Sequence, residues 1–370
     1  MTIRKVNILR LLRVSIFLIV FLVLFQSFSI LFIPKDGKHD MVWTSYITNA
    51  YRGEKNDSID VLMIGNSDAY RGFSPIDCWK DYGISSCVSG KPWQNSRGAY
   101  NILRDALRYQ KPSIVILETD MFYSERPRVS IRKLAFKELK SIKTDFFSGR
   151  DNVVQSLDKR IDFLIKTMTK SGFSKEIQNL DDGLETKINY YFPLLIYHER
   201  WNSLNVKDIT DIDNVWHFAS KGFVLSKDCE PYSGGYDYMD IKSKKTVKIA
   251  DKPLSYLNKI VDLCEQNNIK LVLVCMPSAF SWTGQKHLAV AEFAQSHNLE
   301  FIDYNLPETN TGFDWLTDSV DGGNHLNYNG ALMITTNLGK YLKDNFELPD
   351  HRSDPYYMQW EDDIKIFMES

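Results

Sequence analysis

Residues 60–75 read DVLMIGNSDAYRGFSP, and this stretch decides the fold. Its apolar run, VLMI, is continuous, which is typical of a strand that helices cover on both faces. Gly65, Asn66 and Ser67 then interrupt the run with residues that tolerate a sharp turn. Such a turn at the end of a buried strand presents the hydroxyl and the N–H of Ser67 at one point. The stretch therefore predicts either a serine nucleophile or a serine that only caps the next helix.

Strand-like and helix-like segments alternate along much of the remaining chain. Short apolar runs predict strands at 114–117, 271–275 and 301–304, and the run SSCVSG predicts a short strand at 85–90 that ends in glycine. Apolar residues at helical spacing predict helices over 95–110, from Pro253 to Cys264, over 285–297, and after Asn329, which is the expected cap of the last helix. This order predicts an α/β fold, in which helices flank a doubly wound parallel sheet on both faces.

A second polar motif, DGGNHLN, occupies residues 321–327. The carboxyl ends of parallel strands meet at one edge of a sheet, so Ser67 and His325 are expected to converge there. Together the two motifs resemble the SGNH (GDSL-like) hydrolase superfamily, whose first block is a strand ending in Gly-x-Ser and whose last block carries an Asp and a His on one loop. The resemblance covers residues 59–124 and 251–345. It implies a flavodoxin-like three-layer fold and serine esterase or O-acyltransferase chemistry without a cofactor.

The acid of the expected triad is displaced by one position. In the superfamily it commonly lies three residues before the histidine, where this chain has Gly322. The nearest acid is Asp321, and the two glycines that follow it permit a turn back to His325. Asp318 is the alternative acid, and without either carboxylate Ser67 and His325 would act as a dyad.

The resemblance also implies two oxyanion donors. The N–H of Ser67 is one, and Gly90 matches the glycine that supplies the second, although a glycine at a strand end has a plain structural explanation as well. At the third block this chain departs from the superfamily pattern, because 118–120 reads ETD in place of Gly-x-Asn-Asp. The amide of Gln94 or Asn95 is the predicted replacement for the missing asparagine.

Residues 14–33 predict a transmembrane anchor. These 20 residues carry no charge, and as a helix they span the ~30 Å of a bilayer core. Four basic residues precede the segment and no acidic residue does, which favours a cytoplasmic N-terminus and an extracytoplasmic catalytic domain at the cell membrane. A cleaved signal peptide is the alternative, but 25–34 offers no small-x-small cleavage site. The expected organisation is a cytoplasmic segment 1–13, the anchor 14–33, an α/β domain 39–345 with an insertion 125–250, and a tail 346–370.

Composition agrees with one folded domain outside the membrane. Charged residues make up 25% and apolar residues 44% of the chain, which suffices for a large core. A net charge of −2 is unlike that of nucleic-acid binders, which are usually more basic. The histidines and cysteines show no metal-binding spacing, so no metal is expected.

The insertion 125–250 interrupts the alternation of strands and helices. Its basic part, 126–150, is typical of a solvated amphipathic helix, or of a contact with anionic lipid headgroups or an anionic envelope polymer. Further on, His198, Arg200 and Trp201 combine ionisable and aromatic side chains, as sugar-binding clefts do and as a buried core pair also does. A similar stretch in membrane-anchored SGNH proteins of bacterial cell envelopes implies that these three residues form a substrate wall.

The expected function is O-acyl transfer to a cell-envelope glycan, either a surface polysaccharide or a teichoic-type polymer. Similar anchored proteins work beside a multispanning acyl exporter, which implies a membrane-bound O-acyltransferase as partner. Two alternatives stay open: an esterase (deacetylase) of the same fold, and a catalytically inactive glycan-binding or scaffold protein.

Overall fold

The computed structural model describes residues 2–32, 47–124, 192, 194–204, 206, 209, 217–240, 247–309 and 312–369. The chain divides into two compact units, Met1–Lys35 with Arg126–Val215, and Asp36–Glu125 with Trp216–Ser370. The basic stretch 126–150 lies outside the described residues, as does most of the predicted insertion.

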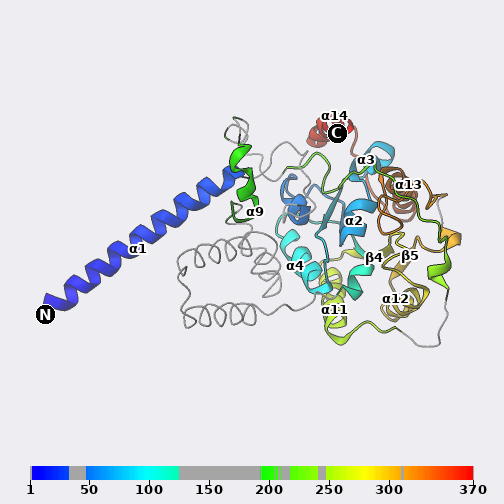
Figure 1. Cartoon of the computed structure of the whole chain (residues 1–370), viewed down its shortest axis with the longest axis horizontal. Helices are drawn as coiled ribbons and strands as arrows, with labels where there is room; N and C mark the ends of the chain where they lie inside the picture. Colours follow the sequence, from blue (N-terminus) through cyan, green and yellow to red (C-terminus); the bar gives the residue numbers. More distant parts are fainter. Residues whose placement is uncertain are drawn as a thin grey trace, which may run out of the picture. The chain divides into compact units, whose positions relative to one another are not determined.

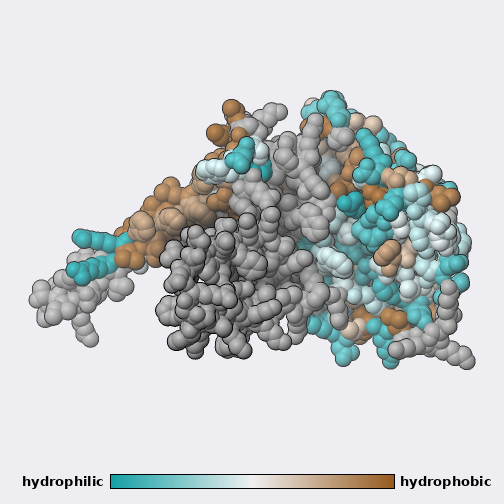
Figure 2. Space-filling model, in the orientation of Figure 1, coloured by the Kyte–Doolittle hydropathy of each residue, from teal (hydrophilic) through white to brown (hydrophobic). Residues whose placement is uncertain are grey.

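The first unit contains the long apolar helix α1 (Thr2–Ser29), which η1 (Ile30–Phe32) continues. Leu12–Phe32 has a mean hydropathy of 2.6 and is long and apolar enough to cross a membrane. Figure 2 shows the corresponding hydrophobic surface along α1. This length and composition fit both a membrane anchor and a signal sequence. This unit also holds α9 (Leu194–Tyr197) and η5 (His198–Asn202).

The second unit is built on a five-stranded parallel sheet with the order β2-β1-β3-β4-β5. Its strands are β1 (Val61–Gly65), β2 (Ser86–Gly90), β3 (Ile114–Glu118), β4 (Lys270–Cys275) and β5 (Glu300–Asp303). All residues of β1, β2 and β3 are buried, as continuous apolar runs require. The order is that of a flavodoxin-like sheet, so the predicted doubly wound fold is confirmed.

Helices cover this sheet in two further layers (Figure 1). They are α2 (Ser67–Gly72), α3 (Pro75–Tyr82), α4 (Ser96–Ala106), α11 (Asp251–Gln266), α12 (Gly284–Ser296) and α13 (Tyr328–Asn345). Helix α13 packs against α2 and α3, whereas α4 packs against α11. The prediction that Asn329 caps the last helix is wrong, because Asn327 is the N-cap and its side chain accepts from Gly330 N.

The order of the sheet places a topological switch point between β1 and β3. The connection that leaves β1 runs to β2 on one side, and the connection that leaves β3 runs to β4 on the other side. Ligands of doubly wound sheets bind beyond the carboxyl ends of the strands at this point. Ser67 follows β1 and Asp120 follows β3, so both residues lie at the edge of the sheet where such ligands bind.

Residues 217–240, which the sequence assigns to the insertion, form part of the second unit. Val88 N of β2 donates to Lys221 O at 2.9 Å. The ammonium of Lys221 is fully buried, and it pairs with Glu54 at 2.8 Å and with Asp363 at 2.6 Å. Asp363 belongs to the C-terminal helix α14 (Gln359–Met368), so these ion pairs connect the tail to the α/β core.

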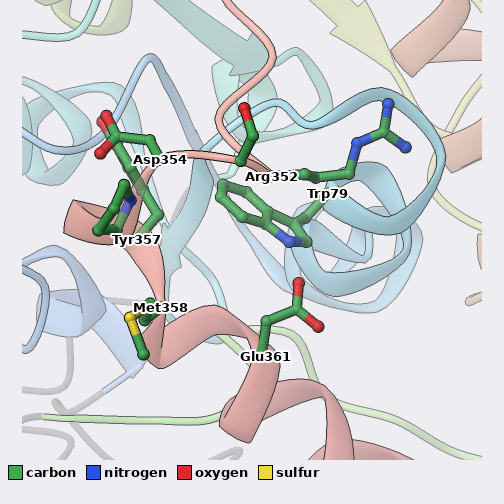
Figure 3. Close-up of a pocket in the computed structure, with 8 residues that line it drawn as sticks. Trp79, Arg352, Asp354, Tyr357, Met358 and Glu361 are labelled. Carbon is green, nitrogen blue, oxygen red and sulfur yellow. The ribbon is translucent and has the colours of Figure 1, made fainter.

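The tail also packs through aromatic side chains. Trp360 stacks on Trp79 of α3 with ring centroids 4.5 Å apart. Beside this contact is a pocket that Trp79 and tail residues, among them Arg352, Tyr357 and Glu361, line (Figure 3). None of the predicted site residues lines this pocket.

Short 3₁₀ helices complete the described part of the second unit. They are η3 (Ile47–Arg52), η4 (Asp120–Tyr123), η7 (Asp237–Met239), η8 (Pro307–Thr309) and η9 (Pro355–Tyr357). Of these, η4 directly continues β3 and therefore reaches the switch point.

Candidate active site

The serine turn begins where the buried strand β1 ends. Asn66 is the N-cap of α2, and its Oδ1 accepts from Asp68 N at 2.9 Å. The amide of the same side chain donates to Asp120 Oδ2 at 3.0 Å, which ties the turn to the end of β3. Asn66 and Asp68 are buried, whereas Ser67 between them is partly exposed. The turn thus presents Ser67 at the carboxyl edge of the sheet.

Gly90 lies directly beside this turn, because it pairs with Gly65 in the parallel register of β1 and β2. A Cβ added to Gly90 would lie 2.2 Å from Gly65 O, so only glycine permits this approach of the two strands. The requirement for glycine here is steric, and it brings the Gly90 backbone next to the residues that precede Ser67.

The predicted replacement amides have other contacts. Asn95 is the N-cap of α4, and its Oδ1 accepts from Gly98 N at 2.9 Å. Gln94 is fully buried and donates through Nε2 to Asn95 O at 3.1 Å. Gln94 Oε1 has no hydrogen-bond partner among the described residues. The role of Gln94 in an oxyanion hole stays a prediction.

His325 lies on the loop before α13 and is bound by Asp321. Nδ1 of His325 is 2.6 Å from Asp321 Oδ2, and His325 N donates to Asp321 Oδ1 at 2.7 Å. Gly322 and Gly323 have φ angles of 71° and 95°, a left-handed conformation that allows the chain to turn back between the two residues. Partial burial raises the pKa of Asp321, but hydrogen bonds and charge attraction from His325 outweigh it, so the pKa is lowered.

Asp318, the alternative acid, organises the loop instead. Its Oδ2 accepts from Asp314 N at 2.8 Å and its Oδ1 accepts from Thr317 Oγ1 at 3.0 Å. Its backbone carbonyl accepts from Asn327 N, the cap of α13. These bonds turn the Asp318 carboxylate toward its own loop.

The two sequence motifs meet at the imidazole. Nε2 of His325 lies 3.9 Å from Oδ1 of Asp68, the residue that follows Ser67. No hydrogen bond joins Ser67 Oγ to His325 among the described residues. Nε2 of the imidazole nevertheless faces the serine turn, because its contact is with Asp68.

Two buried acids, at the end of β3 and just after it, complete the surroundings of the turn. Asp120 N donates to Glu118 Oε1 at 2.8 Å, and Asp120 Oδ1 pairs with Lys286 of α12 at 3.1 Å. Burial, followed by the nearby carboxylates of Asp68 and Asp120, raises the pKa of Glu118 well above its ordinary value. The two sequence motifs do not predict a role for Asp68, Glu118, Asp120 or Lys286. The position of the two acids at the end of a strand beside the switch point does indicate that Glu118 and Asp120 lie near the site.

The predicted substrate wall lies in the unit that contains α1. Arg200 Nη1 donates to Phe32 O at 2.9 Å, and the Trp201 ring stacks on Phe32 with centroids 5.7 Å apart. The side chain of His198 lies outside the described part of the chain. Arg200 and Trp201 thus contact the end of the apolar helix, and their role toward a substrate stays a prediction.

The described residues contain no group of three or more His, Cys, Asp or Glu side chains that could hold a metal ion. The polar groups at the switch point are instead a serine, an imidazole and several carboxylates. This set suits proton transfer and nucleophilic attack by the protein's own side chains.

No protein-family model and no curated protein matches this chain. Among solved structures, a “putative acylhydrolase” from Bacteroides fragilis NCTC 9343 is similar. It is 12% identical with a TM-score of 0.34, over 81% of this chain and 94% of that one. These comparisons assign the chain to no family.

Proposed function

We propose that the second unit forms an acyl-enzyme on Ser67 and passes the acyl group to a hydroxyl acceptor, as an SGNH-type serine O-acyltransferase. The observation that carries this proposal is the orientation of His325. Its Nδ1 is bound by Asp321 at 2.6 Å, and its Nε2 faces the residue after Ser67 at 3.9 Å. A base held by a carboxylate beside a presented serine is the arrangement that nucleophilic acyl transfer needs.

The first half-reaction acylates the serine. His325 Nε2 takes the proton of Ser67 Oγ while Oγ forms a bond to the ester carbonyl carbon of the donor. The N–H groups of Ser67 and Gly90 stabilise the resulting oxyanion. When the intermediate collapses, the C–O bond to the donor alcohol breaks and the imidazolium returns its proton to the leaving oxygen.

The second half-reaction repeats these steps with a new hydroxyl. His325 takes the proton of the acceptor, whose oxygen attacks the acyl carbon, and Ser67 Oγ leaves with the proton from the imidazolium. A sugar or polyol acceptor yields a new ester, whereas water would make the protein an esterase. Both outcomes use the same residues.

The apolar helix supports transfer over hydrolysis. An enzyme that collects acyl groups from a membrane-bound O-acyltransferase must remain beside that partner, and Leu12–Phe32 can hold it there. The basic residues before this segment favour a cytoplasmic N-terminus, with the α/β unit outside the cell membrane. We propose a cell-surface polysaccharide or a teichoic-type polymer as the acceptor.

The sign of one mutational effect tests this proposal. Mass spectrometry of isolated envelope polymer measures its acyl-ester content in wild-type cells and in cells that carry Ser67→Ala. A transferase mutant has fewer esters, a deacetylase mutant has more, and a scaffold mutant is unchanged. We expect fewer. A rise would replace the transferase proposal with the esterase one.

A matched strain tests the contribution of the anchor. Exchange of residues 1–33 for a cleavable signal peptide leaves Ser67 intact but releases the α/β unit from the membrane. We expect polymer acylation to fall toward the Ser67→Ala level, because the enzyme no longer meets its acyl-donating partner. Full acylation by the released protein would contradict the role of the anchor.

A further inference from the structure

A buried carboxylate faces the imidazole on the side away from Asp321. Oδ1 of Asp68 lies 3.9 Å from His325 Nε2, and the Asp68 side chain is 4% exposed. Within the described part of the chain this is the one contact of Asp68 with a basic side chain at ion-pair distance, and it becomes an ion pair when the imidazole is protonated. A buried carboxylate is costly unless a charge or hydrogen bonds compensate for it, and His325 is placed to compensate for this one.

The other charged groups around Asp68 do not neutralise it. Glu118 at the end of β3 and Asp120 just after it are acidic, and so is Asp321 on the far side of the imidazole. The ammonium of Lys286 pairs with Asp120. Among these groups, His325 is therefore the one that can offer Asp68 a positive charge, which it carries when protonated.

The protonation states of the two residues are consequently linked. Burial raises the pKa of Asp68 to about 7, against the attraction of His325 and with a further increase from Asp120. The Asp68 carboxyl therefore changes its charge in the neutral pH range.

We infer that Asp68 is a positioning residue of the acyl-transfer reaction and acts through His325. Its carboxylate holds the Nε2 edge of the imidazole at the Ser67 turn. It also stabilises the imidazolium that forms when His325 takes the proton of Ser67. The imidazolium is then flanked by two carboxylates, Asp321 at Nδ1 and Asp68 at Nε2. This inference rests on the proposed function.

The test uses the full chain, purified in detergent, and a fluorophosphonate probe that labels activated serines. The labelling rate of Ser67 is measured between about pH 5 and about pH 9. Asp68→Asn and Asp68→Ser remove the charge, and Asp68→Glu retains it. Asp318→Asn is the matched control, because it removes a buried charge from the loop of His325 but not one that faces the imidazole. Thermal unfolding identifies variants that are folded.

Loss of the charge should shift the acidic limb of the pH profile to lower pH by up to about one unit, because the Asp68 carboxylate favours the protonated imidazole wherever it is ionised. The plateau rate should fall about tenfold, because the imidazolium of the transition state loses the same stabilisation. Asp68→Glu should return the limb toward the wild-type position, and Asp318→Asn should leave it in place.

Two negative results have different meanings. If Ser67 is labelled but the acidic limb stays in place in every folded, charge-removing variant of Asp68, then the inference is overturned and the proposed function stands. If the wild-type chain is not labelled at Ser67 at any pH, the proposed function fails and the role of Asp68 fails with it.

Discussion

Asp321 holds His325 by two hydrogen bonds at once. One carboxylate oxygen lies 2.6 Å from Nδ1 and the other accepts the His325 backbone N–H at 2.7 Å. A residue bound at both its ring and its backbone keeps one ring orientation and one tautomer, which leaves Nε2 available as a base. The double contact joins two residues that are four positions apart in the chain.

Asp321→Asn should therefore lower the rate of aryl-acetate hydrolysis by about 10²- to 10⁴-fold, because an amide favours the wrong tautomer. Asp318→Asn should lower it far less, since the Asp318 carboxylate accepts from Asp314 N and Thr317 Oγ1. Steady-state kinetics of the full chain measures both effects. The reverse order would transfer the role of triad acid to Asp318, and two small effects would indicate a dyad.

Ser67→Ala and His325→Ala should each lower the same activity by about 10⁴-fold or more, and the double mutant should be little worse than either single one. Because the two residues act as one catalytic unit, removal of either one already removes their joint contribution to the rate. Ser255→Ala on the surface of α11 is the control and should behave as wild type, since its hydroxyl only donates to Lys252 O. Additive losses from the two single mutants would argue that they act in separate steps.

Gly90→Ala should destabilise the protein by about 1–3 kcal/mol, because the new Cβ would lie 2.2 Å from Gly65 O. Gly235→Ala is a useful comparison. Its Cβ would meet no atom within 4 Å, and only its φ of 55° opposes the substitution, at about 1 kcal/mol. Thermal unfolding gives both values. A Gly90→Ala protein as stable as wild type would show that the strands can separate here without loss.

The sequence predicts the fold well because the deciding features are local. Buried parallel strands are continuous apolar runs, so β1, β3 and β4 stand out in the chain. The cap of α13 is harder to assign, because Asn327 and Asn329 are both suitable side chains. The bridge between Ser319 and Leu326 ends the His325 loop just before Asn327, and this tertiary contact selects the cap.

The surroundings of the serine turn depend on contacts between distant segments. Lys286 of α12 reaches Asp120 after β3, although the residues predicted as an insertion separate them in the chain. No spacing rule predicts such a pair. Arg200 and Trp201 show that one sequence pattern can fit two structures. A charged and aromatic stretch suits a sugar-binding cleft, but it also packs well against the end of an apolar helix, as it does here.

The pKa of Asp68 predicts a pH-dependent stability. Burial raises it from 3.8 to about 7, so the folded chain binds this proton more tightly than the unfolded chain does. The contribution of Asp68 to stability therefore falls as pH rises from about 4 to about 7, and Asp68→Asn removes this loss. The variant should gain on wild type between those pH values, by on the order of a few kcal/mol. Denaturant unfolding at both pH values measures the difference, and a constant difference would contradict a buried, titrating Asp68.

The acyl-enzyme itself is the most direct test of the account. The full chain is mixed with an aryl acetate, quenched in acid and digested, and peptide mass spectrometry locates any acetyl group. We predict an acetyl ester on Ser67 in the wild type, none on that peptide in Ser67→Ala, and a strongly reduced amount in His325→Ala. An acetyl group on another residue, or ester turnover that persists in Ser67→Ala, would contradict the assignment of Ser67 as the nucleophile.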